Sequence, residues 1–294
     1  MTVSRHPTLA IGLSGGRGML GSDASRTLAA AGHRVTDVDA YCRQPSAAAL
    51  DRVPTRLDWV LHFAARTSVM QSLGDGDAVR QHNLAATQAA IDIAVTRGAA
   101  LLYLSSYVYG VPQYNPIDEL HPVAAVNPYM ASKLDGERMA QAACRSAGLP
   151  LIVLRPFSVY GGQRQPGRLI SDLLAALAQG DALQIHDAEP QRDHLFVADF
   201  SRLVTAVVAQ RAVDGTFNVG SGVAHSNLAV AELVRTLAGD ARAVLVLGKP
   251  RPGDVSVCVA DTRSVRETFG WTPQWSLRDG LAHLIAAART GPSG

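Results

Sequence analysis

The chain has 294 residues, of which 47% are hydrophobic and 18% are charged, and its formal net charge is +2. This composition is that of a globular protein and excludes a disordered chain, while the small and scattered positive charge argues against a nucleic-acid-binding surface. No stretch approaches the roughly 20 apolar residues of a membrane span. Three widely separated cysteines, Cys42, Cys144 and Cys258, predict neither a disulfide framework nor a metal site. We therefore expect a cytoplasmic protein without a bound metal.

The first sixty residues have the order of a dinucleotide-binding unit. An apolar run at 9–13 predicts a buried strand, and it is followed by a glycine-rich turn, a helix that reaches Ala31, and a second strand at 34–39. Glycines let the backbone approach a pyrophosphate at the positive end of the helix, and a carboxylate that ends the second strand accepts hydrogen bonds from the adenosine ribose. The predicted cofactor-binding residues here are Gly15, Arg17, Gly18, Met19, Leu20, Gly21 and Asp39.

The choice between NAD and NADP depends on three charged side chains. Asp39 would repel the 2′-phosphate of NADP and therefore favours NAD. Arg17 in the turn and Arg43 after the second strand could instead pair with that phosphate. NAD is the expected cofactor, and NADP stays open.

Further along the chain, strands and helices alternate to about residue 158, which predicts a doubly wound parallel sheet. Helices are expected at about 78–97, 128–147, 167–179 and 228–238, because a glycine follows each stretch. The histidines His62, His82 and His194 lack the spacing of metal ligands, and we interpret them as structural.

Tyr129 and Lys133 lie four residues apart in the predicted helix at 128–147. Residues at this spacing share one helix face, so both groups can point toward one ligand. A tyrosine has a pKa of about 10 and is a poor proton acceptor near neutral pH. A nearby ammonium favours the phenolate and lowers that pKa. The pair therefore predicts a general base and its cationic partner.

The glycine turn, the strand-end acid and the Tyr-x-x-x-Lys pair together resemble the extended short-chain dehydrogenase/reductases, in the NAD-dependent nucleotide-sugar epimerase/dehydratase group. Other landmarks of that group have similar stretches here, in the same order, at 58–65, 101–110, 127–133, 154–161, 192–199, 217–221, 251–254 and 269–281. The resemblance implies an α/β fold with a Rossmann-type doubly wound sheet and a smaller C-terminal substrate-binding lobe. Residues 1–160 would form the NAD(P)-binding domain, to which about 193–228 returns. Residues 161–294 would form the discontinuous nucleotide-sugar-binding lobe.

The same resemblance implies roles for further residues. The strand at 58–65 would pass the cofactor at Ala64 and Ala65, and the strand after it would end in a catalytic hydroxyl. Counting back from Val108 gives Ser105, which is preferred, whereas counting forward along the strand gives Ser106. The implied substrate-binding residues are Ser158, Arg192, Arg251 and Asp254. One departure from the family pattern concerns adenine: only 18 residues lie between Asp39 and Asp58, where a further strand is usual, and a remnant of it would be 50–53.

The expected reaction is hydride transfer at a sugar carbon of a nucleotide-diphosphate sugar. Tyr129 would take the hydroxyl proton with help from the serine, and Lys133 would also bind the nicotinamide ribose. Dehydratases of the group carry an acidic pair after the catalytic hydroxyl, whereas this chain has Ser106 and Tyr107, so dehydration is disfavoured. A 4-epimerase is favoured. An NADPH-dependent 4-keto-(6-deoxy)hexose reductase is the alternative, followed by a non-catalytic dinucleotide-binding protein.

A homodimer is expected by analogy, through the helices at 78–97 and 128–147. Small side chains on those helices would permit close packing against a partner, or they would face the sheet of their own subunit. The alanines concerned are Ala85, Ala86, Ala89, Ala90, Ala140 and Ala143.

Overall fold

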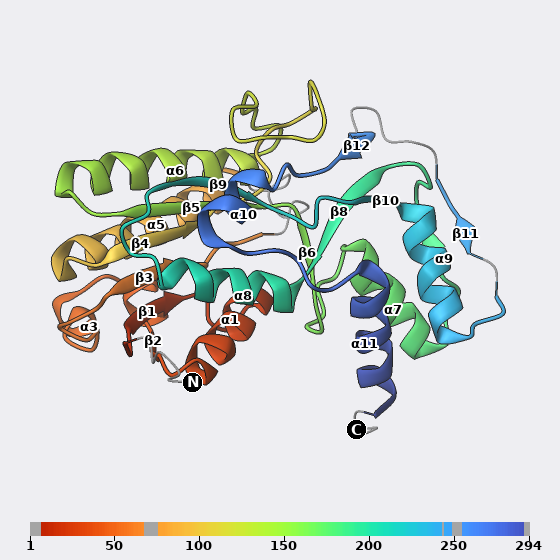
Figure 1. The fold of residues 1–294 in the computed structure, drawn as a ribbon, viewed down its shortest axis with the longest axis horizontal. Coiled ribbons are helices and arrows are strands. Elements are labelled where there is room, and N and C mark those ends of the chain that lie inside the picture. Colours follow the sequence, from red (N-terminus) through yellow and green to blue (C-terminus); the bar gives the residue numbers. More distant parts are fainter. Residues whose placement is uncertain (1–6, 68–75, 243, 249–254, 291–294) are drawn as a thin grey trace.

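The computed structural model describes residues 7–67, 76–242, 244–248 and 255–290. Within these ranges the chain forms a large parallel sheet with helices on both faces, and a smaller lobe of short strands and helices beside it (Figure 1). The expected α/β fold with a doubly wound sheet is confirmed.

The large sheet has the strand order β2-β1-β3-β4-β5-β9, and every neighbouring pair is parallel. Its strands are β1 (Ala10–Ser14), β2 (Arg34–Asp37), β3 (Trp59–His62), β4 (Ala100–Leu104), β5 (Leu151–Pro156) and β9 (Gly215–Val219). Every residue of β1, β3, β4 and β5 is buried, as expected for strands covered on both faces. Strand β2 lies on one side of β1 and strand β3 on the other, so the direction of the strand order reverses at β1. Ligands bind sheets of this kind at the carboxyl ends of the strands beside such a reversal.

The sheet ends at β2 on the side of the predicted adenosine site. Between β2 and β3 the chain forms two short helices, α2 (Asp39–Arg43) and α3 (Ala47–Leu50), and no further strand. The possible strand remnant at 50–53 is the end of α3 and a turn, and Val53 is buried there. The interval after Asp39 is therefore too short for an additional strand beyond β2.

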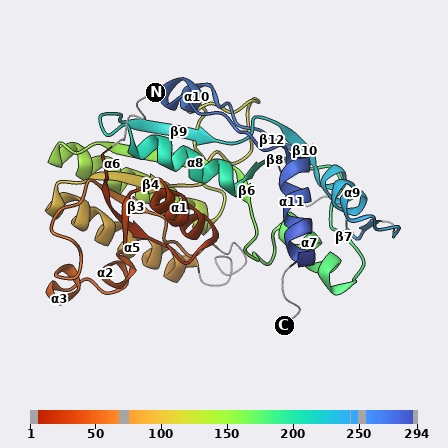
Figure 2. The same ribbon diagram turned by 60° about the horizontal axis from the view of Figure 1, so that its bottom comes forward.

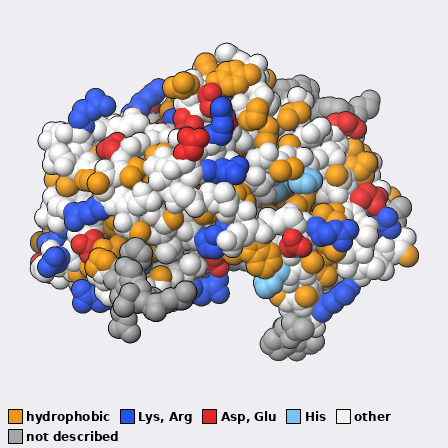
Figure 3. All heavy atoms as spheres, viewed as in Figure 1, with side chains coloured by type: hydrophobic (Ala, Val, Ile, Leu, Met, Phe, Trp, Pro, Cys, Tyr) orange, Lys and Arg blue, Asp and Glu red, His pale blue; other side chains and the backbone are white. Residues whose placement is uncertain are grey.

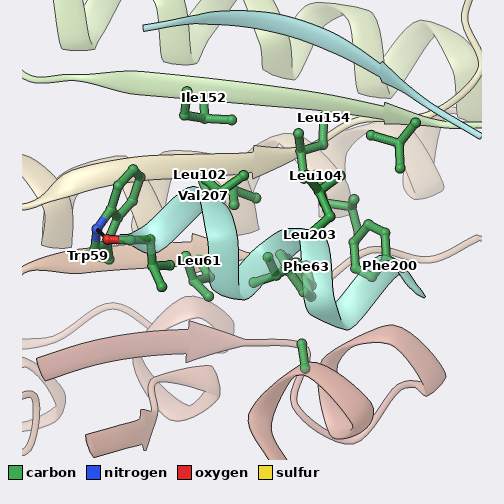
Figure 4. Close-up of a cluster of buried hydrophobic side chains, with 14 of the residues drawn as sticks. Trp59, Leu61, Phe63, Leu102, Leu104, Ile152, Leu154, Phe200, Leu203 and Val207 are labelled. Atoms are coloured by element: carbon green, nitrogen blue, oxygen red, sulfur yellow. Dashed lines mark hydrogen bonds between the residues drawn. The ribbon is translucent and has the colours of Figure 1, made fainter. Parts of the chain in front are cut away.

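Two helical layers cover the sheet (Figures 1 and 2). The helices on one face are α1 (Met19–Ala30), α8 (Val197–Val208) and α10 (Arg263–Phe269), and those on the other are α5 (Gly76–Arg97) and α6 (Pro128–Ala147). Figure 4 shows the core beneath α8, where Phe63 contacts Phe200 edge to face with ring centroids 5.8 Å apart. In the same core the indole nitrogen of Trp59 donates to the Val208 carbonyl at 3.0 Å.

The predicted helices at 78–97 and 128–147 are confirmed as α5 and α6. Helix α6 ends at Gly148, whose φ of +64° lies in the left-handed region that glycine adopts without strain. Most of the alanines considered for a dimer face the sheet: Ala86, Ala89, Ala90 and Ala140 are buried, Ala143 is half-buried, and Ala85 is exposed. The alanine pattern is therefore explained by packing within the subunit.

The smaller lobe follows β5. Its central strands are β6 (Ser158–Tyr160), β8 (Gln191–Phe196), β10 (Ala224–Ser226) and β12 (Val257–Cys258), and β7 (Gln184–Ile185) pairs with β11 (Leu245–Val246). Its helices are α7 (Leu169–Gln179), α9 (Asn227–Ala238) and α11 (Leu277–Thr290), so the helices expected at 167–179 and 228–238 are present. Helix α8 and strand β9 return to the large sheet. Helix α10 also returns, which the sequence did not suggest, because Phe269 packs against Phe217 with ring centroids 4.9 Å apart.

Acidic and basic side chains are interspersed on the face shown in Figure 3. Hydrophobic side chains gather at the top of this view, over the loop between β4 and α6, where Val111, Leu120 and Val126 are exposed. None of the helices in the described ranges is long and apolar enough to cross a membrane.

Candidate active site

The glycine turn joins β1 to α1 and leaves no room for a side chain at Gly15 or at Gly21. Gly15 has a φ of +80°, and a Cβ atom on it would lie 2.6 Å from the Ala64 nitrogen. The Gly18 amide donates to the Gly15 carbonyl at 3.0 Å, and a Cβ on Gly21 would strike that same carbonyl. Helix α1 begins after Gly18 without a side-chain cap or an acidic residue in its first turn, so its amides suit an anion. The turn therefore fits the pyrophosphate of a dinucleotide.

Asp39 lies directly against this turn. It is the first residue of α2, is 7% exposed, and accepts a hydrogen bond from the Gly15 amide at 2.7 Å through Oδ1. The carboxylate thus holds the turn in place and lies where the ribose role was expected. Arg17 and Arg43 are both exposed. The Arg17 carbonyl accepts from the Gln163 side chain at 3.2 Å, which connects the turn to the loop before α7.

Met19 and Leu20 point away from the cofactor-binding surface of the turn. Met19 is buried in the core of the smaller lobe, where its sulfur lies close to Gly161. Leu20 packs against the cores of both lobes. The backbone amides of both residues lie in the first turn of α1, and the part of the two residues in cofactor binding stays a prediction.

Asn83 connects the segment after β3 to α6. Its side-chain oxygen accepts from the Arg66 amide at 2.8 Å, and its nitrogen donates to the Ser132 hydroxyl at 3.0 Å. Ala64 and Ala65, which precede Arg66, are half-buried and lie beside the glycine turn. Asn83 was not predicted from the sequence. The signal that could have identified it is a polar amide among the buried residues of α5, because a buried amide needs hydrogen-bond partners.

Tyr129 lies in the first turn of α6. The Asn127 side chain caps the helix by accepting from the Met130 amide at 2.8 Å, and Pro128 occupies the first helical position. Tyr129 and Lys133 are 8% and 3% exposed. The Lys133 ammonium lies 4.8 Å from the centroid of the Tyr103 ring. The structure therefore buries both members of the predicted pair on one side of the helix.

Burial changes the proton affinities of both groups. It lowers the pKa of the Lys133 ammonium to about 8, and the Glu137 carboxylate partly opposes this change. Burial raises the pKa of Tyr129, while a hydrogen bond with Ser106 and the positive charge of Arg168 act against that rise. The sequence pointed to Lys133 as the group that lowers the tyrosine pKa. In this structure Ser106 and Arg168 act on Tyr129 in that direction, and the effect of Lys133 on the tyrosine pKa stays a prediction.

The two serines at the end of β4 have different partners. Ser105 is 2% exposed and its hydroxyl donates to the Glu137 carboxylate. Ser106 is half-buried and forms the hydrogen bond with Tyr129. The structure therefore brings Ser106 to the tyrosine, in contrast to the count from Val108 that favoured Ser105.

A buried polar network supports this site from beneath. Arg155 on β5 donates to both oxygens of Glu137, from Nε at 2.9 Å and from Nη2 at 2.6 Å. Arg155 also donates to the Tyr109 hydroxyl at 3.0 Å, and that hydroxyl donates to Asn218 at 2.6 Å. The sequence did not reveal this network, whose members lie on α6, β5, β9 and the loop after β4.

His62 at the end of β3 belongs to the frame of the site. Its ring nitrogens lie 2.8 Å from the Ser14 hydroxyl and 3.2 Å from the Thr87 hydroxyl, and the ring stacks on Tyr103. Burial, together with the charge of Lys133, lowers the pKa of His62 to about 3. The neutral imidazole thus orders three elements around Lys133, in keeping with a structural role.

Two of the expected substrate residues, Ser158 and Arg192, lie on strands of the smaller lobe. Ser158 on β6 is half-buried and pairs in register with His194 on β8. Arg192 on β8 donates to the Val255 carbonyl at 2.6 Å, and its charge acts on Tyr107, the residue after Ser106. Arg192 therefore lies near the serine end of the site. Arg251 and Asp254 fall outside the described residues.

A cavity of about 610 Å³ lies in the smaller lobe between α7, β7, β11 and the start of α9. Gly167 and Leu169 line it, and between them is Arg168, whose charge reaches Tyr129. The cavity and the tyrosine are thus linked through the chain segment that opens α7, of which Arg168 is a part. Nothing in the sequence analysis identified it.

Comparison with known proteins agrees with this geometry. Residues 11–220 match the model of the NAD dependent epimerase/dehydratase family. A dTDP-glucose 4,6-dehydratase of Streptomyces griseus is 30% identical over 238 residues, which are 80% of this chain and 73% of that protein. A UDP-glucose 4-epimerase of Streptococcus mutans is 28% identical over 254 residues, covering 79% of this chain and 75% of the relative.

Among solved structures, MoeE5 in complex with UDP-glucose and NAD superposes with a TM-score of 0.84. It is 28% identical, and the match covers 95% of this chain and 98% of MoeE5. Fold, glycine turn, Tyr129–Lys133 pair and family match lead to one conclusion: the chain belongs to the NAD-dependent epimerase/dehydratase family of extended short-chain dehydrogenase/reductases, and its cofactor is NAD.

Proposed function

We propose that the protein is an NAD-dependent 4-epimerase of a nucleotide-diphosphate hexose. The observation that carries the proposal is the position of Ser106 beside Tyr129, where it lowers the pKa of the phenol, with Lys133 one helical turn further along α6. This constellation lies across from a glycine turn that fits a dinucleotide. It is the arrangement needed to move a proton to and from a carbinol oxygen beside a nicotinamide.

Each residue has a defined task in this reaction. NAD, when bound, would supply the hydride acceptor and donor at the sugar carbon, on one face of that carbon and then on the other. Tyr129, as the phenolate, takes the proton of the sugar hydroxyl and later gives it back. Ser106 donates to the same sugar oxygen and favours the phenolate. Lys133 supplies a positive charge beneath the site, since with a pKa of about 8 it is mostly protonated at neutral pH.

The side chain after Ser106 argues against dehydration. Loss of water next to the oxidised carbon needs a proton donor and acceptor in addition to the tyrosine. Tyr107 stands there, and its hydroxyl donates to the Gly110 carbonyl. Glu137, the nearest carboxylate to Ser105, is held by Arg155. Epimerisation, which needs one acid–base group, fits better than the reaction of the S. griseus relative.

A reductase that consumes NADPH is the second candidate. It is favoured by Arg17, whose exposed side chain in the glycine turn could pair with a 2′-phosphate. The buried carboxylate of Asp39 against the same turn opposes that phosphate. Consumption of NADPH by a 4-keto sugar would establish this alternative.

The proposed substrate carries a nucleoside diphosphate. UDP-glucose is named for two of the similar proteins, and the 610 Å³ cavity offers room for a nucleoside near Tyr129. The charges of Arg168 and Arg192 act on Tyr129 and on Tyr107, respectively, and guanidinium groups suit a diphosphate. Ser158 remains a proposed substrate residue on the same lobe, and Arg251 and Asp254, which lie outside the described residues, also remain proposed.

Two further expectations are kept as proposals. The nucleotide-sugar lobe comprises residues 161–294 apart from a returning segment. That segment was expected at about 193–228; in the structure only α8 and β9 of this range return, and α10 returns in addition. The protein acts as a homodimer through the outer surfaces of α5 and α6, and an equilibrium sedimentation mass near the 31.0 kDa monomer would contradict this.

The experiment that tests the reaction is incubation of the protein with UDP- and dTDP-hexoses and catalytic NAD. We expect interconversion of the C4 epimers, followed by NMR, without net formation of NADH. Stoichiometric consumption of NADPH by the 4-keto sugar, with no epimerisation, would overturn the proposal in favour of the reductase.

A further inference from the structure

A fourth hydrophobic cluster lies at the serine end of the site, separate from the cores of the two lobes. Its buried members are Tyr109, Ile117 and Cys258, and its half-buried members are Tyr107, Phe157 and Val255. Tyr107 contacts Phe157 edge to face, with ring centroids 5.3 Å apart. Clusters of this kind usually hold a fold together, but three of these six side chains keep part of their surface exposed.

The three half-buried members are neighbours of the proposed substrate residues. Tyr107 follows Ser106, and Phe157 precedes Ser158. The Val255 carbonyl accepts the hydrogen bond of Arg192. The apolar surface therefore lies between the reacting end of the site and the arginine proposed for the diphosphate, which is where the sugar ring must lie.

The described part of this surface offers mainly carbon atoms, because its thiol, on Cys258, is buried and interacts with Tyr107. The Tyr107 hydroxyl donates to the Gly110 carbonyl, and the Tyr109 hydroxyl donates to Asn218. Phe157 and Val255 have no polar side-chain atoms. A sugar hydroxyl pressed against this surface would lose its water without gaining a partner, which weakens binding. A methyl group in the same place would gain from burial.

We infer that the sugar of the substrate is a 6-deoxyhexose and that Tyr107 and Phe157 determine this specificity. In a hexose, C6 projects from the ring beside C4, so its substituent reaches the side chain one residue from Ser106. The inference rests on the proposed function, because it places C4 at Ser106 and Tyr129. It narrows the substrate from any nucleotide-diphosphate hexose to those with a methyl group at C6.

The test compares sugar pairs that differ only in the hydroxyl at C6, namely dTDP-glucose with dTDP-6-deoxyglucose and the corresponding UDP pair. Dissociation constants are measured by calorimetry on the NAD-loaded protein, and kcat/KM is measured for both sugars. We expect the 6-deoxy sugar to be preferred by about 10- to 100-fold, the range that an apolar pocket achieves against an added hydroxyl. Equal constants, or preference for the 6-hydroxyl sugar, would overturn the inference.

Two variants test whether Phe157 causes the preference for the 6-deoxy sugar. Phe157→Tyr adds one hydroxyl to the surface and should reduce the ratio between the two sugars severalfold, whereas Phe157→Leu keeps the surface apolar and should retain it. An unchanged ratio in Phe157→Tyr would overturn the role of Phe157. Tighter binding of the 6-deoxy sugar without any change at its C4 would support this inference and overturn the proposed reaction. Epimerisation of both sugars with equal kcat/KM and equal dissociation constants would overturn this inference and support the proposed reaction.

Discussion

Glu137 and Arg155 form a buried ion pair joined by two hydrogen bonds, of 2.9 Å and 2.6 Å. The pair connects α6, which carries Tyr129 and Lys133, to β5. Because Glu137 also accepts from Ser105, it fixes the end of β4 directly before Ser106. One carboxylate thus sets the relative positions of the hydroxyl and the helix that the proposed reaction needs.

Glu137→Gln should destabilise the protein by about 3–5 kcal/mol, because the Arg155 charge stays buried without its counter-ion. The matched control is Arg138→Gln, which removes an exposed ion pair with Asp135 and should cost less than about 1 kcal/mol. Urea unfolding measures both free energies. Equal losses in the two variants would contradict the role given to the buried pair.

Substitution of Ser106 should affect kcat, whereas substitution of Ser105 should affect the stability of the fold. Ser106→Ala removes the partner of Tyr129 and should lower kcat by about 10²- to 10³-fold, with a small effect on substrate affinity. Ser105→Ala should cost about 1–2 kcal/mol of stability through its lost bond to Glu137, and should change kcat far less. Steady-state kinetics and urea unfolding of both variants test this. A larger loss of kcat in Ser105→Ala would show that the roles are the other way round.

Arg168 should influence the pH dependence of the reaction through Tyr129. The positive charge favours the phenolate, so Arg168→Ala should raise the pKa of Tyr129 further and shift the rise of kcat with pH to more alkaline values. Arg168→Lys keeps a positive charge and should shift the profile less. The measurement is kcat against pH for the three proteins, and superimposable profiles would refute the electrostatic contact.

His62 should make stability fall in acid. Its pKa is about 3 in the folded protein and about 6.5 when unfolded, because burial disfavours the imidazolium. The contribution of the neutral His62 ring to the free energy of unfolding is present in full above pH 6.5 and is lost as the pH falls toward 3. At pH 4 the loss is about 3 kcal/mol. His62→Gln should give a flatter dependence of the free energy of unfolding on pH between 6.5 and 4. An equal dependence of the free energy of unfolding on pH in both proteins would contradict this role of His62.

Local patterns in the sequence were enough to predict much of the fold. The four predicted helices could be placed because caps and following glycines are local signals, and the glycine turn could be recognised because its spacing and flanking elements are contiguous. Tyr129 and Lys133 could be paired for the same reason, since helical geometry fixes the relation between residues four apart.

The remaining features of the site depend on contacts between distant segments. Ser105 and Ser106 could not be assigned from the sequence because successive side chains at a strand end point to opposite sides, so a shift of one residue exchanges their surroundings. Asn83 binds Ser132, and Glu137 binds Arg155, across intervals that no local pattern spans. Met19 was predicted to bind the cofactor because of its place in the turn, but its side chain is buried in the core of the smaller lobe.

The most direct test of the central claim is a single turnover of the Tyr129→Phe variant. NAD-loaded wild-type protein and variant are mixed in a stopped-flow instrument with the UDP- or dTDP-sugar that the wild type converts, and NADH absorbance is followed. We expect transient NADH in the wild type, and formation slowed about 10²- to 10⁴-fold in the variant with NAD affinity retained. Formation of NADH at the wild-type rate in Tyr129→Phe would contradict the assignment of Tyr129 as the general base.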